Sequence, residues 1–182
     1  MVHYQRLLII NQMNSLKVLG LMSGNSIDGL DCCVSEIVLN ENYFFKYKII
    51  KYDTLPYDFK VKQTINSIIS NPFENKIKND NTLGLIFAEY AMKFMNSTDL
   101  DLVATHGQTI FHSDFETSIQ IGNPKYLQDA YKCPIVYNFR NADIKAGGNG
   151  APLMPFLDWL LFRESNKNTL TLNIGGISNI SI

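Results

Sequence analysis

Residues 18–31, VLGLMSGNSIDGLD, decide the fold of this chain. A short apolar run predicts a buried strand, and the apolar rhythm resumes beyond a polar turn, so the pattern is strand, turn, strand. The turn is rich in residues that tolerate a positive φ or hydrogen-bond their own backbone. Such a turn presents backbone N–H groups and hydroxyls to an anionic ligand such as a phosphate. An ordinary β-hairpin turn has the same composition, so the turn alone leaves both interpretations open.

Composition and length are those of an ordinary globular protein, with 182 residues, 46% hydrophobic and 18% charged. This length is enough for one well-packed domain or slightly more. The formal net charge of -1 at pH 7 gives no electrostatic case for nucleic acid or an anionic membrane as a partner. The apolar run at residues 7–10 is too short for a signal peptide or a membrane span. Three cysteines fit neither a disulfide framework nor a metal site, which predicts a reducing, cytoplasmic location.

Hydrophobic periodicity predicts an antiparallel meander followed by two helices. Strands are expected at about residues 17–22, 30–38 and 43–52, after an N-terminal extension over residues 1–16. The first helix is expected over 57–70 and stops at Asn71-Pro72. The second is expected over 83–94, with Asn81 or Thr82 placed to cap it.

The rest of the chain alternates short strands with helices. The expected elements are a buried strand over 102–105, a small strand at 119–121, a helix over 124–132, a buried strand over 134–138 and a hydrophobic helix over 152–164. Residues 139–150 are expected to form a long polar loop. The last segment, 169–182, repeats the strand, glycine turn, strand pattern.

This order of elements is α/β and resembles the N-terminal lobe of the actin, sugar-kinase and Hsp70 superfamily, a ribonuclease H-like mixed sheet flanked by helices. In that fold, two similar lobes each contribute a phosphate-binding hairpin. A doubly wound sheet or another ribonuclease H-like domain would give nearly the same order.

Four motifs together resemble the anhydro-N-acetylmuramic acid kinase family. They are GLMSGNSIDGLD (20–31), THGQTIFH (105–112), NFRNADIKAGGNGAPLMP (138–155) and LNIGGISNI (172–180). The resemblance implies a cytoplasmic enzyme of peptidoglycan recycling that uses ATP, Mg²⁺ and a water. Its substrate would be 1,6-anhydro-N-acetylmuramic acid and its product N-acetylmuramic acid 6-phosphate. A homodimer is a further expectation.

The sequence departs from the family pattern in two ways. The first glycine loop usually reads Gly-Thr-Ser in the family, whereas here it is Gly24-Asn25-Ser26; the Asn side chain still donates and accepts hydrogen bonds. The family also continues into a C-terminal lobe. We therefore expect residues 17–164 to be the N-terminal kinase lobe and 169–182 the first hairpin of the second lobe. Alone, the chain is expected to be inactive and prone to aggregate.

The resemblance implies that the ATP phosphates are bound by both glycine turns. The residues concerned are Gly24, Asn25, Ser26, Ile27, Asp28, Gly29, Leu30 and Asp31 in the first turn and Gly175 and Gly176 in the second. The first turn lacks the Gly-Lys-Ser/Thr ending of a Walker loop. Asp28 is the carboxylate best placed to hold Mg²⁺, directly or through water. Its alternative role is to cap the turn.

Asp143 is the residue that we expect to transfer the proton. Opening the anhydro bridge needs a base to take a proton from the water that attacks C1, and a positioned carboxylate suits this step. Neighbouring glycines let the backbone approach a sugar closely. The alternative is a surface aspartate paired with Arg140 or Lys145.

The sugar is expected to lie near the end of the 102–105 strand, where α/β sheets place ligand groups. By resemblance, the substrate-binding residues are His106, Gln108, Thr109, Arg140 and Asn149. Arg140 can bind the lactyl carboxylate or a phosphate through a bidentate fork, or pair with Asp143. His106 and His112 lack the carboxylate pattern of a zinc site.

Two alternatives to the anhydro-sugar kinase stay open at this point. One is a sugar- or nucleotide-binding module without catalysis. The other is a related kinase that acts on a different sugar.

Overall fold

The computed structural model of the chain describes residues 15–39, 45–174 and 178–182. Its centre is a mixed sheet with the strand order β3-β2-β1-β4-β5, in which β6 also pairs with β4. The strands are β1 (Leu16–Ser23), β2 (Gly29–Leu39), β3 (Phe45–Pro56), β4 (Leu102–Ser113), β5 (Thr117–Ile121) and β6 (Ile135–Val136). The first three are antiparallel, whereas β4 runs parallel to β1 and to β6. The predicted meander and the mixed sheet are therefore confirmed.

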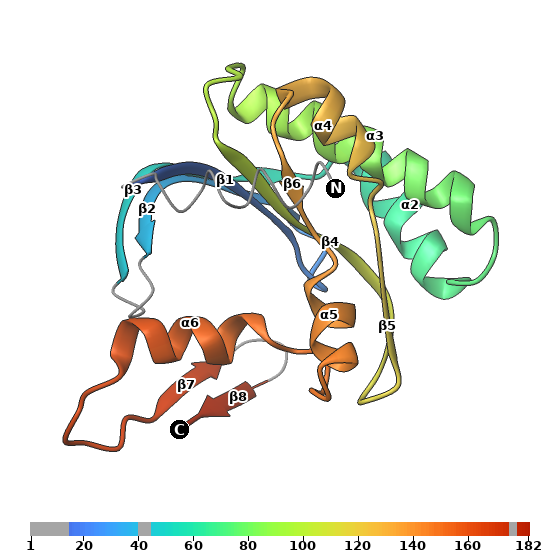
Figure 1. Ribbon diagram of the computed structural model, residues 1–182. Coiled ribbons are helices and arrows are strands. Elements are labelled where there is room, and N and C mark those ends of the chain that lie inside the picture. Colours follow the sequence, from blue (N-terminus) through green and yellow to red (C-terminus); the bar gives the residue numbers. More distant parts are fainter. Residues whose placement is uncertain (1–14, 40–44, 175–177) are drawn as a thin grey trace.

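Three helices cover one face of this sheet (Figure 1). They are α2 (Phe59–Ser70), α3 (Lys76–Phe94) and α4 (Lys125–Tyr131). The core forms because alternate strand residues turn to these helices: Leu19 and Leu30 are buried with Ile65 and Phe87. Burying each such side chain contributes roughly 1.5–3 kcal/mol. Asp58 caps α2, because its side chain accepts from the Val61 N–H at 2.8 Å.

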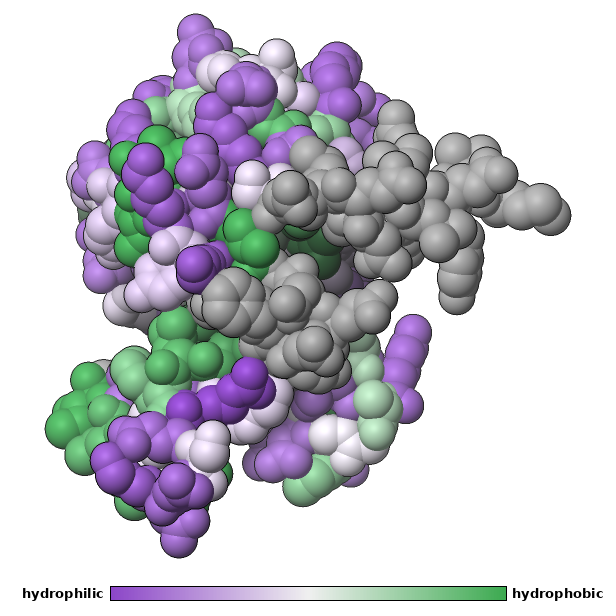
Figure 2. Space-filling view, turned by 60° about the vertical axis from the view of Figure 1, so that its left-hand side comes forward, coloured by the Kyte–Doolittle hydropathy of each residue, from purple (hydrophilic) through white to green (hydrophobic). Residues whose placement is uncertain are grey.

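The remaining elements lie on the other side of the sheet (Figure 1). They are α5 (Phe139–Lys145), α6 (Leu153–Phe162), β7 (Thr171–Ile174) and β8 (Ser178–Ser181). The β7–β8 hairpin forms a separate two-stranded sheet, and Thr171 Oγ1 donates to Asp158 Oδ2 of α6 at 2.6 Å. No residue of α6 is buried, and Figure 2 shows hydrophobic residues on the surface of this lower part. Within the described ranges, no helix is long and apolar enough to cross a membrane.

The second helix differs from its prediction at the N-terminal end. It begins at Lys76, after Asn75 in the left-handed conformation, so Asn81 and Thr82 are interior residues and not caps. Thr82 Oγ1 donates to the Lys78 carbonyl one turn earlier at 2.8 Å. The first turns of α3 are exposed and have no apolar face, so periodicity detected only the part that packs on the core.

Three further predictions were wrong in the region of the expected site. The 102–105 strand continues as β4 to Ser113, because residues 108–113 pair with β5 as a hairpin; His106, Gln108 and Thr109 therefore lie within the strand and not after it. The expected loop at 139–150 contains the helix α5, and the strand expected at 134–138 shrinks to β6. No residue of α5 is buried, so the helix has no apolar period to reveal it.

Candidate active site

The turn between β1 and β2 exposes backbone and polar side chains. The Ile27 N–H donates to the Gly24 carbonyl at 3.3 Å, and Asn25, Ser26 and Asp28 are exposed. Ile27 has a φ of 53°, a left-handed conformation that β-branched residues rarely adopt. Its side chain packs against the core, which holds the strained backbone in place. Strained turns of this kind are concentrated at ligand sites.

Asp28 is both a turn cap and an exposed anion. Its Oδ1 accepts from Ser26 Oγ at 2.8 Å and from the Gly29 N–H at 3.0 Å, and the Ser26 hydrogen bond is the main cause that lowers the pKa of Asp28. Among the described residues, Oδ2 accepts no hydrogen bond. One ionised, exposed carboxylate fits Mg²⁺, which needs one or two carboxylates plus phosphate oxygens and water. No cluster of three or more metal-ligating side chains is present in this part of the chain.

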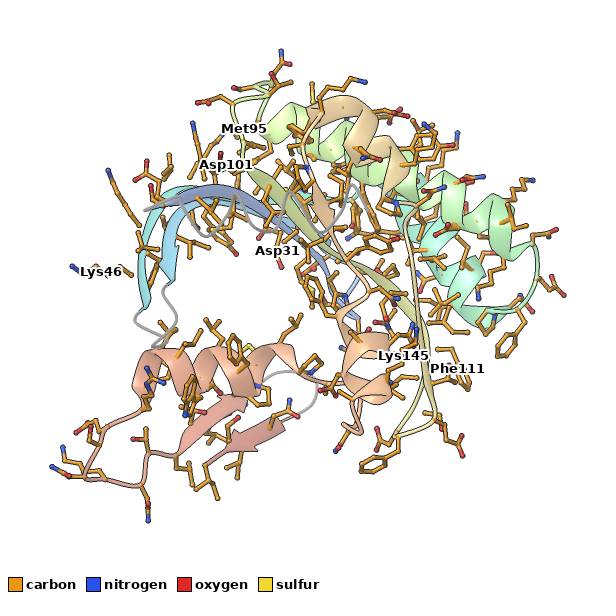
Figure 3. All side chains as sticks on the ribbon, in the orientation of Figure 1. Asp31, Lys46, Met95, Asp101, Phe111 and Lys145 are labelled. Atoms are coloured by element: carbon orange, nitrogen blue, oxygen red, sulfur yellow. The ribbon has the colours of Figure 1, made fainter. Side chains whose placement is uncertain are left out.

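Asp31 lies on the opposite face of β2 from the core. Leu30 and Cys32 point to the helices, and Figure 3 shows Asp31 on the side of the sheet that faces α6. Asp31 Oδ1 accepts from Thr54 Oγ1 of β3 at 2.5 Å. Leu30 is buried in the core, so only its backbone can face a ligand.

Gln108 is fully buried behind the first turn. Its Oε1 accepts from Ser23 Oγ at 2.6 Å, and Ser23 Oγ in turn accepts from Tyr57 OH at 2.8 Å. Burial raises the pKa of Tyr57, so the phenol keeps the proton that it donates. Gln108 therefore joins β4 to β1 and to the N-terminal end of α2, in a position that supports the turn.

His106 and Arg140, both expected to bind substrate, bind each other. Arg140 Nε donates to His106 Nε2 at 2.9 Å, although the two residues are 34 positions apart. His106 Nδ1 lies 3.0 Å from the Gly107 carbonyl. Burial, and secondarily the Arg140 cation, lower the pKa of His106; burial also lowers the pKa of Arg140. The imidazole is therefore neutral at pH 7.

Asp143 and Arg140 hold the two backbone polar groups of Gly150. The Gly150 N–H donates to Asp143 Oδ2 at 2.8 Å, and the Gly150 carbonyl accepts from the Arg140 guanidinium at 2.9 Å. A Cβ at Gly148 would collide with the Asp143 carboxylate, so the loop of residues 146–150, here called the glycine loop, lies directly against it. In the part of the chain that the structure describes, Asp143 pairs with neither Arg140 nor Lys145.

A pocket of about 200 Å³ lies beside His106 and Gly107. Gln120 and Asp80 line it as well, and neither was singled out from the sequence. Gln120 Nε2 donates to Thr109 Oγ1 at 3.2 Å, while its buried Oε1 has no partner among the described residues. The signal that could have revealed Gln120 is a polar residue between two isoleucines of a small strand.

The remaining predicted site residues are Asn149, Gly175 and Gly176. Asn149 is exposed on the glycine loop. Gly175 and Gly176 lie outside the described residues, between β7 and β8.

The mixed sheet with helices on its face and a glycine turn at its first hairpin defines a lobe of the actin-like sugar-kinase class. The family model for anhydro-N-acetylmuramic acid kinase matches residues 16–182, so the chain belongs to that family.

Similar proteins of this name come from several bacteria. The protein from Bacillus cereus (strain ATCC 10987 / NRS 248) is 34% identical over 185 residues, which cover 91% of this chain and 46% of the relative. The protein from Caldanaerobacter subterraneus subsp. tengcongensis is 31% identical over 194 residues, which cover 97% of this chain and 49% of the relative. The chain thus spans about half the length of the curated relatives that it matches.

Proposed function

We propose that this chain carries the phosphate-binding turn and the catalytic base of an anhydro-N-acetylmuramic acid kinase. The reaction uses ATP and water to convert 1,6-anhydro-N-acetylmuramic acid into N-acetylmuramic acid 6-phosphate and ADP. Membership of the family supports the reaction, and the relatives carry the kinase name. The observation that carries the proposal is the Asp143 carboxylate, held by the Gly150 N–H against a loop of small residues.

Asp143 is proposed to accept a proton from the water that attacks C1 of the sugar. The C1–O6 bond of the bridge then breaks, and O6 takes the γ-phosphoryl group as ADP leaves. A positioned general base accelerates such a step by about 10²–10⁴-fold. Only one Asp143 oxygen is engaged by Gly150, so the other is available to the water. The glycines of the loop let the sugar approach without a clash with a Cβ.

The turn at residues 24–28 is proposed to bind the ATP phosphates through its backbone N–H groups. Asp28 would hold Mg²⁺, directly or through a water, because its ionised carboxylate is exposed at that turn. When bound, Mg²⁺ neutralises charge on the phosphate oxygens. The proposal also implies a cytoplasmic location, where ATP is available, and a homodimer stays a prediction.

The test uses the full product of the gene, including any residues that follow Ile182. It is incubated with ATP, Mg²⁺ and the anhydro sugar, and ADP and sugar 6-phosphate are measured together. Equal amounts of both products are expected, and no ADP without the sugar. N-acetylmuramic acid, a reducing sugar that lacks the 1,6-anhydro bridge, serves as the control substrate. Faster phosphorylation of this or another sugar than of the anhydro sugar would contradict the proposal and favour a different sugar kinase.

A further inference from the structure

His106 fixes the position of the Arg140 side chain through a hydrogen bond. His106 is 6% exposed, and its Nε2 faces the Nε–H of Arg140 at 2.9 Å. A guanidinium can only donate, so Nε2 must be the unprotonated acceptor. The single ring proton is therefore on Nδ1, where it is donated to the Gly107 carbonyl at 3.0 Å. The neutral form of His106 with the proton on Nδ1 is the only one that satisfies both contacts.

Arg140 passes this constraint to the glycine loop. The Arg140 guanidinium also donates to the Gly150 carbonyl at 2.9 Å, and the Gly150 N–H donates to Asp143 Oδ2 at 2.8 Å. Gly150 is buried and has a φ of 86°, so the loop has little room to shift. A continuous chain of hydrogen bonds thus runs from His106 through Arg140 and Gly150 to the Asp143 carboxylate.

We propose that His106 is a positioning residue that holds the Asp143 carboxylate in place through Arg140 and Gly150, and does so only while its imidazole is neutral. The proposal rests on the proposed role of Asp143 as the base. It assigns to His106 a function in addition to any contact with the sugar.

Protonation of His106 would break this chain of hydrogen bonds. An imidazolium presents an N–H and a positive charge to the guanidinium, so the acceptor is lost and two cations face each other in a buried place. The other titratable groups that line the same pocket are Asp80 of α3 and Tyr137 before α5. The Asp80 carboxylate is already engaged by the Gly122 N–H at 2.8 Å. Burial and the nearby Arg140 lower the pKa of His106, so the chain of bonds stays intact at neutral pH.

The first experiment needs no catalysis. NMR on the wild-type protein would follow the His106 ring nitrogens, the Arg140 Nε–H and the hydrogen-exchange protection of the Gly150 amide between pH 5 and pH 7.5. We expect Gly150 protection to fall at least tenfold as His106 becomes protonated. Protection that stays the same while His106 titrates would overturn the proposal, whether or not the protein proves to be a kinase.

The second experiment compares substitutions in the full product of the gene. His106→Leu removes the acceptor, and we expect kcat at neutral pH to fall at least tenfold relative to wild type while the sugar Kd stays within about twofold. The difference in kcat should shrink at acidic pH, where the wild-type imidazole is protonated as well. His106→Gln keeps an acceptor that cannot be protonated at these pH values. It should restore most of the rate lost in His106→Leu and shift the acid limb of the kcat profile to lower pH.

His112→Gln is the matched control. His112 lies against Gly150 and pairs with Asp114 at 2.9 Å, but among the described residues it makes no hydrogen bond to Arg140, Gly150 or Asp143. Its substitution should leave the acid limb of the kcat profile unchanged, and Gly150 protection in this variant should still fall as His106 becomes protonated. If His106→Leu fails to fold, the kcat–pH profile of His106→Gln and the wild-type NMR data still test the proposal. A wild-type acid limb that His106→Gln does not move would overturn the proposal.

Discussion

Ser23 Oγ donates to Gln108 Oε1 at 2.6 Å, and this buried bond joins the last residue of β1 to the middle of β4 beside the candidate site. The turn that we propose to bind phosphate begins at the next residue, Gly24. Tyr57 OH donates to the same serine hydroxyl, so β1, β4 and the start of α2 are fixed together. The polar network therefore acts as the foundation of the turn, since each of its members is satisfied inside the core.

Gln108→Leu is expected to destabilise the fold by about 1–3 kcal/mol, because the Ser23 hydroxyl loses its acceptor in a buried place. The measurement is the free energy of unfolding in urea. Gln128→Leu, an exposed glutamine of α4, serves as the control and should change stability by less than about 0.5 kcal/mol. A Gln108→Leu variant of unchanged stability that loses sugar binding would instead make Gln108 a substrate contact.

Asp28→Asn is expected to raise the Mg²⁺ concentration needed for half-maximal rate by about 10- to 100-fold, as for the loss of a group that supports a metal. The amide oxygen can still accept from Ser26 and Gly29, so the turn should remain folded. The rate is measured against Mg²⁺ concentration at saturating ATP.

Asp129→Asn is the control for this substitution. Asp129 is an exposed aspartate of α4, and a hydrogen bond from Lys125 is the main cause that lowers its pKa. It lies outside the site, and its replacement should leave the Mg²⁺ dependence unchanged. The same Mg²⁺ dependence in Asp28→Asn as in wild type would leave Asp28 as a turn cap alone.

Much of the fold was predictable because the elements that form the core have an apolar period. The meander of β1, β2 and β3 and the helices α2 and α4 lie close to their predicted ranges. The extension of β4 was not predictable in this way, since it depends on pairing with β5 and on Gly107 with its φ of 71°. The helix α5 has no hydrophobic period in its sequence, because all its residues are at least partly exposed.

The site was predictable as a set of motifs but not as a set of contacts. Asp143 and Gly150 are neighbours in one motif, so their meeting follows from a short loop. His106 and Arg140 come from different motifs, and only the parallel pairing of β6 with β4 brings their segments together. Sequence reasoning therefore placed both residues near the sugar and could not reveal that they bind each other.

Stability is expected to fall when the pH is lowered through the range of histidine titration. His106 has a pKa of 6.5 in its unperturbed state and a lower one in the fold, so below about 6.5 the unfolded chain binds more protons. The stabilising effect of the neutral form is complete above 6.5 and is lost as the pH falls through the folded value. The slope is at most about 1.4 kcal/mol per pH unit. Urea unfolding at several pH values measures this slope, and His106→Gln should remove the part of the slope that is due to His106.

The chain of 182 residues is expected to self-associate when produced by itself. Ile174 and Ile180 of the β7–β8 hairpin are 74% and 62% exposed, on a two-stranded sheet with open edges. Replacing both with lysine should reduce the associated fraction in light scattering. Ile77→Lys is the matched control, because Ile77 is 82% exposed but lies in the first turn of α3 and not on the hairpin. A chain that stays monomeric at every concentration tested would contradict this expectation.

Asp143→Asn is expected to lower kcat at least about 100-fold, because an amide cannot accept the proton of the attacking water. The Asn oxygen can still accept from the Gly150 N–H, so the loop and the sugar Kd should change little. Since bridge opening and phosphorylation are proposed to be coupled, ADP and sugar phosphate should disappear together. Asp143→Ala, which also loses the Gly150 contact, should weaken sugar binding and lower the thermal midpoint in addition.

The comparison of the two variants separates a chemical role of Asp143 from a structural one. A structural aspartate would give a mild Asp143→Asn variant and a severe Asp143→Ala variant, with rate, binding and stability falling in parallel. A catalytic aspartate gives similar losses of kcat in both, because both lack the base. The measurements are kcat, sugar Kd and the thermal midpoint for each variant, with Asp114→Asn as an exposed control. A folded Asp143→Asn variant that retains more than about a tenth of the rate would remove Asp143 from the mechanism.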